Sequence, residues 1–403
     1  MLDRDHFERL DLDDPLTAVT ARFHLPDGVV YLDGNSLGPL PAHVSRALAR
    51  VVDEEWGEGL IRSWNRGWWE LAGEVGDVIG GMIGAPAGTV IAGDTTTAAL
   101  FKTTMAALRL RPSRPVILTD SGNFPTDLYV LEAAAGLSGA SLEVVGPHEV
   151  EGRIGDDVAV VALTHVDYRT GRRHDLAAIS EAAHRAGSLV VWDLSHSAGA
   201  MEIDIACADM AVGCGYKYLN GGPGAPAFTY VSRDLLPEFT NPISGWWGHR
   251  EPFAMRTDFE PAPGIERTQV GTPPVISLAA LRSALEVFEG VPTRLLREKS
   301  ERLVGDFVRL VDERLDGFQL VTPRRPEERG SHVALSHPRA REIMAALISE
   351  GVIGDVRPPH LLRFGLAPAF QRHVDVWDAV EAIRRVMDND LWRSAVVPSG
   401  PVT

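Results

Sequence analysis

The sequence has little cysteine, no excess of basic residues and no long apolar run, and each shortage argues against a class of protein. Its two cysteines, Cys207 and Cys214, have a spacing that suits neither a disulfide framework nor a metal site. A formal charge of −16 argues against nucleic acid or an anionic membrane as the main partner. No apolar run is long enough for a membrane span, and residues 1–8 lack the features of a signal peptide. We therefore expect a soluble, cytoplasmic, oligomeric protein without a metal.

Helical and strand-like patterns alternate along the first two thirds of the chain. Apolar runs predict buried strands at residues 116–119, 158–164, 188–192 and 208–214, and a helix fits residues 175–186. Further helices are expected over residues 43–56 and directly after Thr95, Thr96 and Thr97. This alternation predicts an α/β fold with a mainly parallel sheet between helices, in which ligands bind at the carboxyl ends of the strands.

The sequence pattern changes from residue 277, where long helical patterns alternate with short strand-like runs near residues 319–321, 332–335 and 361–364. We expect a large domain over residues 31–285 and a smaller α+β domain over residues 286–403. The N-terminal segment, residues 1–30, is expected to pack with the smaller domain.

Lys217 is the most informative residue of the chain. It follows a strand-like run and opens into a glycine-rich turn, and Asp193 ends an earlier buried strand. A lysine and an acid in these places suit pyridoxal phosphate (PLP), because the lysine can form a Schiff base and the carboxylate can keep the pyridine nitrogen protonated. A surface lysine and an unrelated strand-end aspartate are the simpler alternative, but the joint pattern favours the cofactor.

Other residues have a possible place around such a cofactor, each with a plain structural alternative. Thr96 and Thr97 open a helix whose N–H groups suit the phosphate, or they serve only as helix caps. His196 and Tyr216 are near enough in sequence to reach the same phosphate, or they belong to the core. Phe124 is a candidate to stack on the ring and Asp127 to bond its substituents, or the two merely pack and cap a helix.

An arginine and two tryptophan clusters are further candidates for a site. Arg363 lies in a strand-like run, where a guanidinium suits the carboxylate of an α-amino acid, although a structural salt bridge is equally common. Trp246 and Trp247 stand in a glycine-flanked loop, and Trp64 belongs to a second tryptophan cluster. These clusters are expected to line an active site or a subunit contact, with some members in plain core packing.

With these residues assembled, the chain resembles kynureninase from about residue 31 to residue 363. The matching segments are LDGNSLG (32–38), NFPTD (123–127), YRTG (168–171), DLSHSAG (193–199), YKYLNGG (216–222) and GWWGH (245–249). Wider PLP relatives share each segment alone, but the joint order is specific. The resemblance implies the type I fold of PLP enzymes, with a seven-stranded sheet and a smaller C-terminal domain.

The same resemblance implies hydrolysis of L-kynurenine to anthranilate and L-alanine in tryptophan degradation, by a homodimer with shared active sites. Lys217 is then the Schiff-base lysine and Asp193 faces the pyridine nitrogen. Arg363 takes the substrate carboxylate, and Tyr216 is our choice to activate water. The remaining cofactor positions are Thr96, Thr97, Phe124, Asp127, Thr164, His196 and Tyr216, joined from the neighbouring subunit by Trp246 and Thr272; Asn35, Ser36 and Trp64 are the remaining substrate positions.

Thr272 and Trp64 depart from the animal members of that family, which have asparagine and histidine at the matching positions. Loss of both polar groups leaves a ring hydroxyl without a partner, which costs a few kcal/mol when it is buried. The sequence therefore predicts a preference for L-kynurenine over 3-hydroxykynurenine.

Three other functions remain open at this stage. A cysteine desulfurase or selenocysteine lyase needs a nucleophilic cysteine after the lysine, and none follows Lys217. An aminotransferase uses the same lysine and acid. A PLP-binding regulator without turnover is disfavoured by the lack of a basic DNA-binding segment.

Overall fold

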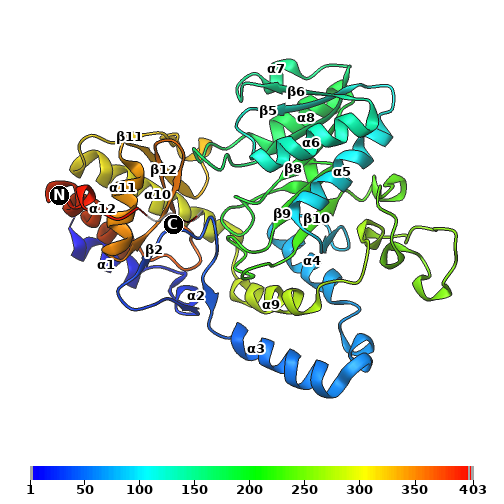
Figure 1. The fold of residues 1–403 in the computed structure, drawn as a ribbon, viewed down its shortest axis with the longest axis horizontal. Helices are drawn as coiled ribbons and strands as arrows, with labels where there is room; N and C mark the ends of the chain where they lie inside the picture. Colours follow the sequence, from blue (N-terminus) through cyan, green and yellow to red (C-terminus); the bar gives the residue numbers. More distant parts are fainter. Residues whose placement is uncertain (1–2, 398–399, 401–403) are drawn as a thin grey trace.

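The computed structural model describes residues 3–397 and 400, and its elements gather around two sheets (Figure 1). The larger sheet has seven strands in the order β4-β10-β9-β8-β7-β5-β6. Strands β9, β8, β7, β5 and β6 run parallel, whereas β10 is antiparallel to its neighbours β9 and β4. The bounds are β4 (Val90–Ala92), β5 (Val116–Asp120), β6 (Ser141–Val145), β7 (Val158–Thr164), β8 (Leu189–Asp193), β9 (Met210–Cys214) and β10 (Ala227–Val231).

Helices flank this sheet and bury its central strands along their whole length, which is why those strands are continuous apolar runs in the sequence. Helix α5 packs along β7 to β10, α6 covers β5 and β6, and α4 lies against β4. The mainly parallel seven-stranded sheet between helices is as predicted. The helices are α3 (Val44–Arg50), α4 (Leu71–Met82), α5 (Thr96–Leu110), α6 (Pro125–Ser138), α7 (Val150–Arg153), α8 (Leu176–Ala186) and α9 (Val275–Leu285).

A second hydrophobic core surrounds a four-stranded antiparallel sheet of order β11-β12-β15-β14. The N-terminal part of the chain contributes to this core through Phe7 and Leu32, and β2 pairs with β13. The domain boundaries at residues 30 and 285 stay predictions. The elements are α1 (Arg4–Leu12), β2 (Val30–Tyr31), α10 (Thr293–Arg314), β11 (Gln319–Leu320), β12 (His332–Ser336), α11 (Ala340–Ser349), β13 (Val352–Ile353), β14 (Asp355–Arg357), β15 (Leu361–Gly365) and α12 (His373–Asp388).

Short elements join the two sheets. Helix α2 (Thr17–Thr20) precedes a small antiparallel pair, β1 (Phe23–His24) and β3 (Leu40–Pro41). The helix expected over residues 43–56 is α3 followed by a π-helical stretch, Val51–Gly59. Within the described part of the chain, no helix is both long and apolar enough to cross a lipid bilayer.

Candidate active site

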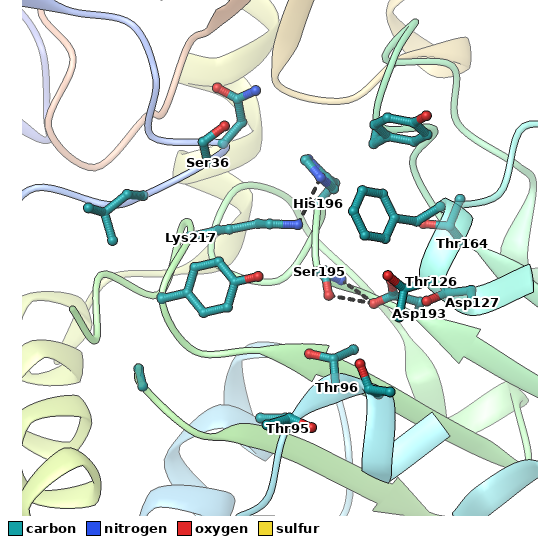
Figure 2. A pocket seen from close by; sticks show the side chains of 18 of the residues that line it. Ser36, Thr95, Thr96, Thr126, Asp127, Thr164, Asp193, Ser195, His196 and Lys217 are labelled. Atoms are coloured by element: carbon teal, nitrogen blue, oxygen red, sulfur yellow. Dashed lines mark hydrogen bonds between the residues drawn. The ribbon is translucent and has the colours of Figure 1, made fainter. Parts of the chain in front are cut away.

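A cavity of about 560 Å³ lies at the carboxyl ends of the central strands, where the N-terminal segment and β15 approach the larger sheet (Figure 2). It brings together twelve of the fifteen residues expected at a site, from both hydrophobic cores of the chain. These are Asn35, Ser36, Thr96, Thr97, Phe124, Asp127, Thr164, Asp193, His196, Tyr216, Lys217 and Arg363.

The turn after β9 directs Lys217 into this cavity. A backbone hydrogen bond from Gly221 N to Gly215 O, 2.9 Å long, closes the turn. The lysine Nζ lies 2.9 Å from His196 Nε2 (Figure 2). Burial, and then the nearby Lys217 charge, lowers the pKa of His196. The imidazole therefore stays neutral and can accept a hydrogen bond from the lysine amine.

Gly38 holds the same turn from the side of the N-terminal segment. Its N–H donates to Tyr216 O at 2.8 Å. A Cβ at Gly38 would collide with the Lys217 carbonyl oxygen and with the Asn220 side chain. The close approach of these two backbones therefore requires glycine.

Two carboxyl groups, Asp193 and Asp127, share the floor of the cavity. Asp193 Oδ1 accepts hydrogen bonds from Ser195 N at 2.8 Å and from Ser195 Oγ at 2.6 Å, which fixes its orientation at the end of β8. Asp127 is buried, and its Oδ2 has no hydrogen-bond partner. Burial first, and the neighbouring Asp193 second, raises the pKa of Asp127 well above its ordinary value. A cationic N–H group beside this pair would relieve both the repulsion and the missing hydrogen bond.

The N-terminus of α5 opens onto the cavity. Thr95 caps the helix by accepting from Ala98 N at 3.3 Å, and Thr96 and Thr97 supply hydroxyls in the first turn. Free N–H groups and hydroxyls at a helix N-terminus suit a phosphate.

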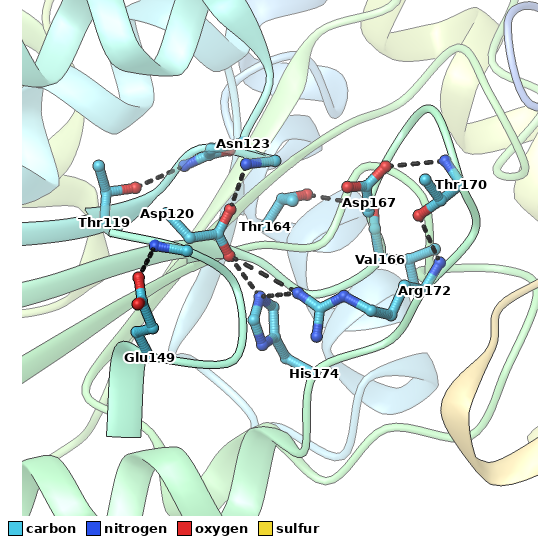
Figure 3. Close-up of polar contacts among 12 residues, drawn as sticks. Thr119, Asp120, Asn123, Glu149, Thr164, Val166, Asp167, Thr170, Arg172 and His174 are labelled. Carbon is cyan, nitrogen blue, oxygen red and sulfur yellow. Dashed lines mark hydrogen bonds and ion pairs between the residues drawn. The ribbon is translucent and has the colours of Figure 1, made fainter. Parts of the chain in front are cut away.

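Phe124 and Tyr168 form an aromatic wall of the cavity. Their ring centroids are 5.0 Å apart and their planes meet at 87°. Asp120 holds the loop that carries Phe124, because its carboxylate accepts from Gly122 N at 2.7 Å and contacts His174 Nε2 at 2.6 Å (Figure 3). Buried side-chain bonds thus fix this loop, although loops are usually the mobile part of a site.

Asp167 does the same for the loop that carries Tyr168. Its Oδ1 accepts from the backbone N–H groups of Arg169 and Thr170, each at 2.8 Å (Figure 3). The two loops therefore bring Phe124 and Tyr168 together with little freedom to separate.

Arg363 reaches the cavity from β15 and is buried in a polar network. Its Nε donates to Asp355 Oδ1 at 2.8 Å, and its Nη2 contacts Asp355 Oδ2. Nη2 also donates to Ser36 Oγ at 2.9 Å, and Nη1 donates to Tyr168 O at 2.5 Å. With the amide oxygen of Asn35 turned toward the guanidinium, that oxygen accepts from Nε at 2.9 Å. Arg363 thus joins the second core to the loop of the aromatic wall.

Curated relatives decide the family of this chain. Kynureninase from Burkholderia pseudomallei (strain 1106a) is 46% identical over 406 residues, which cover 98% of each chain. Kynureninase from Pseudomonas fluorescens is 46% identical over 408 residues, with the same coverage. The family model "Kynureninase C-terminal domain" matches residues 296–383. The chain belongs to the kynureninase family.

Solved structures confirm the type I fold of PLP enzymes. The apo cysteine desulfurase from Thermococcus onnurineus has a TM-score of 0.79 at 18% identity, covering 93% of this chain and 98% of its own. A C-DES mutant with glycine covalently linked to the PLP cofactor has a TM-score of 0.77 at 16% identity, covering 95% and 99%. At such low identity the likeness concerns the fold alone. A cysteine desulfurase function is also disfavoured, because no cysteine follows Lys217 in this chain.

The cavity of this kynureninase-family chain fits PLP. Within the described part of the chain, three buried polar atoms of cavity residues have no hydrogen-bond partner: Asp127 Oδ2, His196 Nδ1 and Arg357 Nε. Lys217 is within reach of the same space, and the first turn of α5 supplies an anion site. Amine, acid and phosphate cradle are thus present together around one cavity.

Three expected site residues do not line the cavity of the single chain: Trp64, Trp246 and Thr272. Trp64 and Trp246 pack around Trp247, with ring centroids 5.2 and 4.8 Å from it. Trp246 is 42% exposed. The expected role of Trp246 and Thr272 in a neighbouring subunit's site stays a prediction, as does the role of Trp64.

Among the cavity residues that have no expected role from the sequence, three carry polar groups that the site uses: Tyr168, Ser195 and Arg357. Tyr168 and Ser195 lie inside motifs that were recognised, so the motifs themselves carried the signal. Arg357 ends the three-residue strand β14, which is too short to leave a pattern in the sequence.

Proposed function

We propose that this protein hydrolyses L-kynurenine to anthranilate and L-alanine, with PLP held by Lys217. Membership of the kynureninase family makes it a PLP-dependent hydrolase of the kynurenine pathway. The observation that carries the residue assignment is the convergence of Lys217, Asp193 and Arg363 on one cavity. Asp193 would face the ring nitrogen, Phe124 the ring plane, and Thr96 and Thr97 the phosphate.

The residues around Lys217 support its role in moving protons. PLP, when bound, supplies the electron sink for the pair left behind as the Cα–H bond breaks. The lysine amine lies beside neutral His196, which can accept a hydrogen bond from one N–H of the amine. The nitrogen lone pair then stays free to take the α-proton. Water must then add to the γ-carbonyl of the substrate before the carbon–carbon bond breaks.

Tyr216 is better suited to give a proton than to take one. Burial, and then neighbouring Cys214, raises the pKa of the Tyr216 phenol above its ordinary value. A phenol that stays protonated is a poor base for water. We therefore infer that Tyr216 donates a hydrogen bond in the cavity, in place of the water-activating role expected from the sequence.

The decisive assay uses the purified protein with PLP and L-kynurenine. We expect fluorescent anthranilate and an equimolar amount of alanine, and no product from Lys217→Ala. A yellow, PLP-loaded protein that leaves kynurenine untouched would reject the activity while keeping the cofactor.

Substrate preference is proposed from Thr272 and Trp64. We expect L-kynurenine to be preferred over 3-hydroxykynurenine, because neither residue replaces the polar partners of the animal family members. The double change Trp64→His with Thr272→Asn should move kcat/KM toward the hydroxylated substrate by about tenfold. Comparable turnover of both substrates by the unaltered protein would contradict the proposal.

We further propose a homodimer and a cytoplasmic location. Exposed apolar side chains gather on the segments of the two tryptophan clusters, more than a free surface usually carries. Trp246 and Trp69 each pack on Phe253, with centroids 6.0 and 5.4 Å apart. The exposed members include Trp56, Leu60, Ile61, Trp246, Phe253 and Met255.

A further inference from the structure

Arg363 alone has little capacity left for a substrate carboxylate. A guanidinium has five N–H donors. Four hydrogen bonds, to Asp355, Ser36 and Tyr168, use four of them. A two-point grip on a carboxylate therefore requires either the loss of an existing bond or a second cationic group.

Arg357 supplies such a group on the same wall. It ends β14, which pairs antiparallel with β15, so Arg357 and Arg363 extend from neighbouring strands. Its Nη2 lies 2.7 Å from Asp355 Oδ2 and 3.4 Å from Ser36 Oγ. Its Nε is buried without a hydrogen-bond partner, and the side chain lines the cavity. Arg357 therefore has donors to spare where Arg363 has few.

The charge balance at this wall also favours an anion. Asp355 is shared by two guanidinium groups. Asp33 also lies close to this network. Burial first, and then the neighbouring Asp355, raises the pKa of Asp33 to about 7. Near neutral pH Asp33 carries only part of a charge, so the two arginines outweigh the acids around them.

We propose that Arg357 is a second binding residue for the α-carboxylate of the amino-acid substrate, acting beside Arg363, with Asp355 holding the two guanidiniums in place. The proposal rests on the proposed function, because it assumes an α-amino acid in this cavity. Asp355 already presents one carboxylate to both arginines, and the substrate carboxylate would take the face of Arg357 that Asp355 leaves open.

The test compares a ligand that has the carboxylate with one that lacks it. L-Alanine, the expected product, and ethylamine both carry a primary amine, and their binding is titrated by the absorbance of the PLP-loaded protein. In Arg357→Gln we expect L-alanine to bind about tenfold to a hundredfold more weakly, while ethylamine binding is unchanged. The matched control is Arg309→Gln, which removes the same charge from an exposed helix position and should change neither titration.

Equal weakening of both ligands, or of neither, would overturn the proposal. The KM for L-kynurenine should rise in Arg357→Gln with a smaller change in kcat, which a merely structural role would not produce. Should Arg357→Gln fail to fold, Arg357→Lys keeps the charge and should weaken L-alanine alone, to a lesser degree. Both titrations measure ligand binding and do not require turnover, so they can be read even if the unaltered protein fails to cleave kynurenine. Failure of this inference is therefore distinguishable from failure of the proposed function.

Discussion

At the scale of single residues, the site is built from groups whose charge depends on what surrounds them. Asp127 lies beside Asp193 in a buried floor, and burial with that neighbour raises its pKa. Burial, and then the Lys217 charge, lowers the pKa of His196. Both groups are thus kept neutral beside a charged neighbour, an arrangement that is common where a cofactor or substrate completes the charge balance.

Asp33 gives a prediction about stability and pH. Its folded pKa of about 7 lies above the unfolded value near 4, so the folded state binds the proton more tightly between these values. The contribution of Asp33 to stability is therefore greatest at low pH and falls as pH rises toward 7. We expect Asp33→Asn to raise the melting temperature relative to the unaltered protein at pH 8 more than at pH 5.5.

The measurement is thermal unfolding at both pH values, with the exposed Asp316→Asn as a control that should show no such difference. An Asp33→Asn effect that is equal at the two pH values would contradict the raised pKa.

At the scale of elements, the lysine turn depends on a contact from a distant part of the chain. A Cβ added at Gly38 would lie 2.4 Å from the Lys217 carbonyl oxygen and 2.8 Å from the Asn220 Cα, so the two backbones approach closely. The glycine-rich turn after β9 is therefore positioned by the N-terminal segment as well as by its own sequence.

Gly38→Ala should therefore disturb cofactor binding without removing any group that touches the cofactor. Overpacking of this kind costs ~1–3 kcal/mol, because one of the two backbones must shift. We expect a lower melting temperature and less bound PLP, measured by absorbance after dialysis. Gly73→Ala is the matched control, since a Cβ there meets nothing within 4 Å and lies in helix α4. Full PLP loading of Gly38→Ala would show that the turn tolerates the shift.

Elements that bury long apolar runs were the ones that sequence could predict. The strand expected at residues 158–164 is β7, and the acid expected at the end of a strand is the last residue of β8. Strands β4, β6 and β10 were not predicted: β4 is short, β6 is only partly buried, and β10 follows an irregular turn. Arg357 was missed because its contacts with Asp355 and Ser36 depend on the pairing of β14 with β15, which a short strand does not reveal in the sequence.

At the scale of the whole molecule, the exposed tryptophan clusters are the main feature that a single chain leaves unexplained. In the single chain, Trp246 and Phe253 present apolar surface to solvent. A second copy that covers this surface would also bring Trp246 and Thr272 to the other cavity, which is the arrangement we propose.

Mixed dimers test this arrangement. If Trp246 acts in the partner's site, a dimer of one Lys217→Ala subunit and one Trp246→Ala subunit has one intact site. Random pairing of the two variants, each nearly inactive alone, should then restore about a quarter of the full activity. The control pairs Lys217→Ala with Asp193→Ala. Each of these lesions disables the site of its own subunit, so this mixture has no intact site and should restore no activity.

Light scattering after size exclusion should give twice the chain mass of 43.7 kDa. A monomer, or no recovery in the Trp246 mixture, would contradict the shared site.

The division of the cavity between two hydrophobic cores has an evolutionary consequence. The lysine, the acid and the phosphate cradle stand on the larger sheet, whereas Ser36, Arg357 and Arg363 come from the side of the smaller one. Mutations on the smaller side can therefore change which amino acid is recognised while the reactive groups keep their geometry. Lineages that carry this architecture can acquire new substrates without having to reinvent the chemistry.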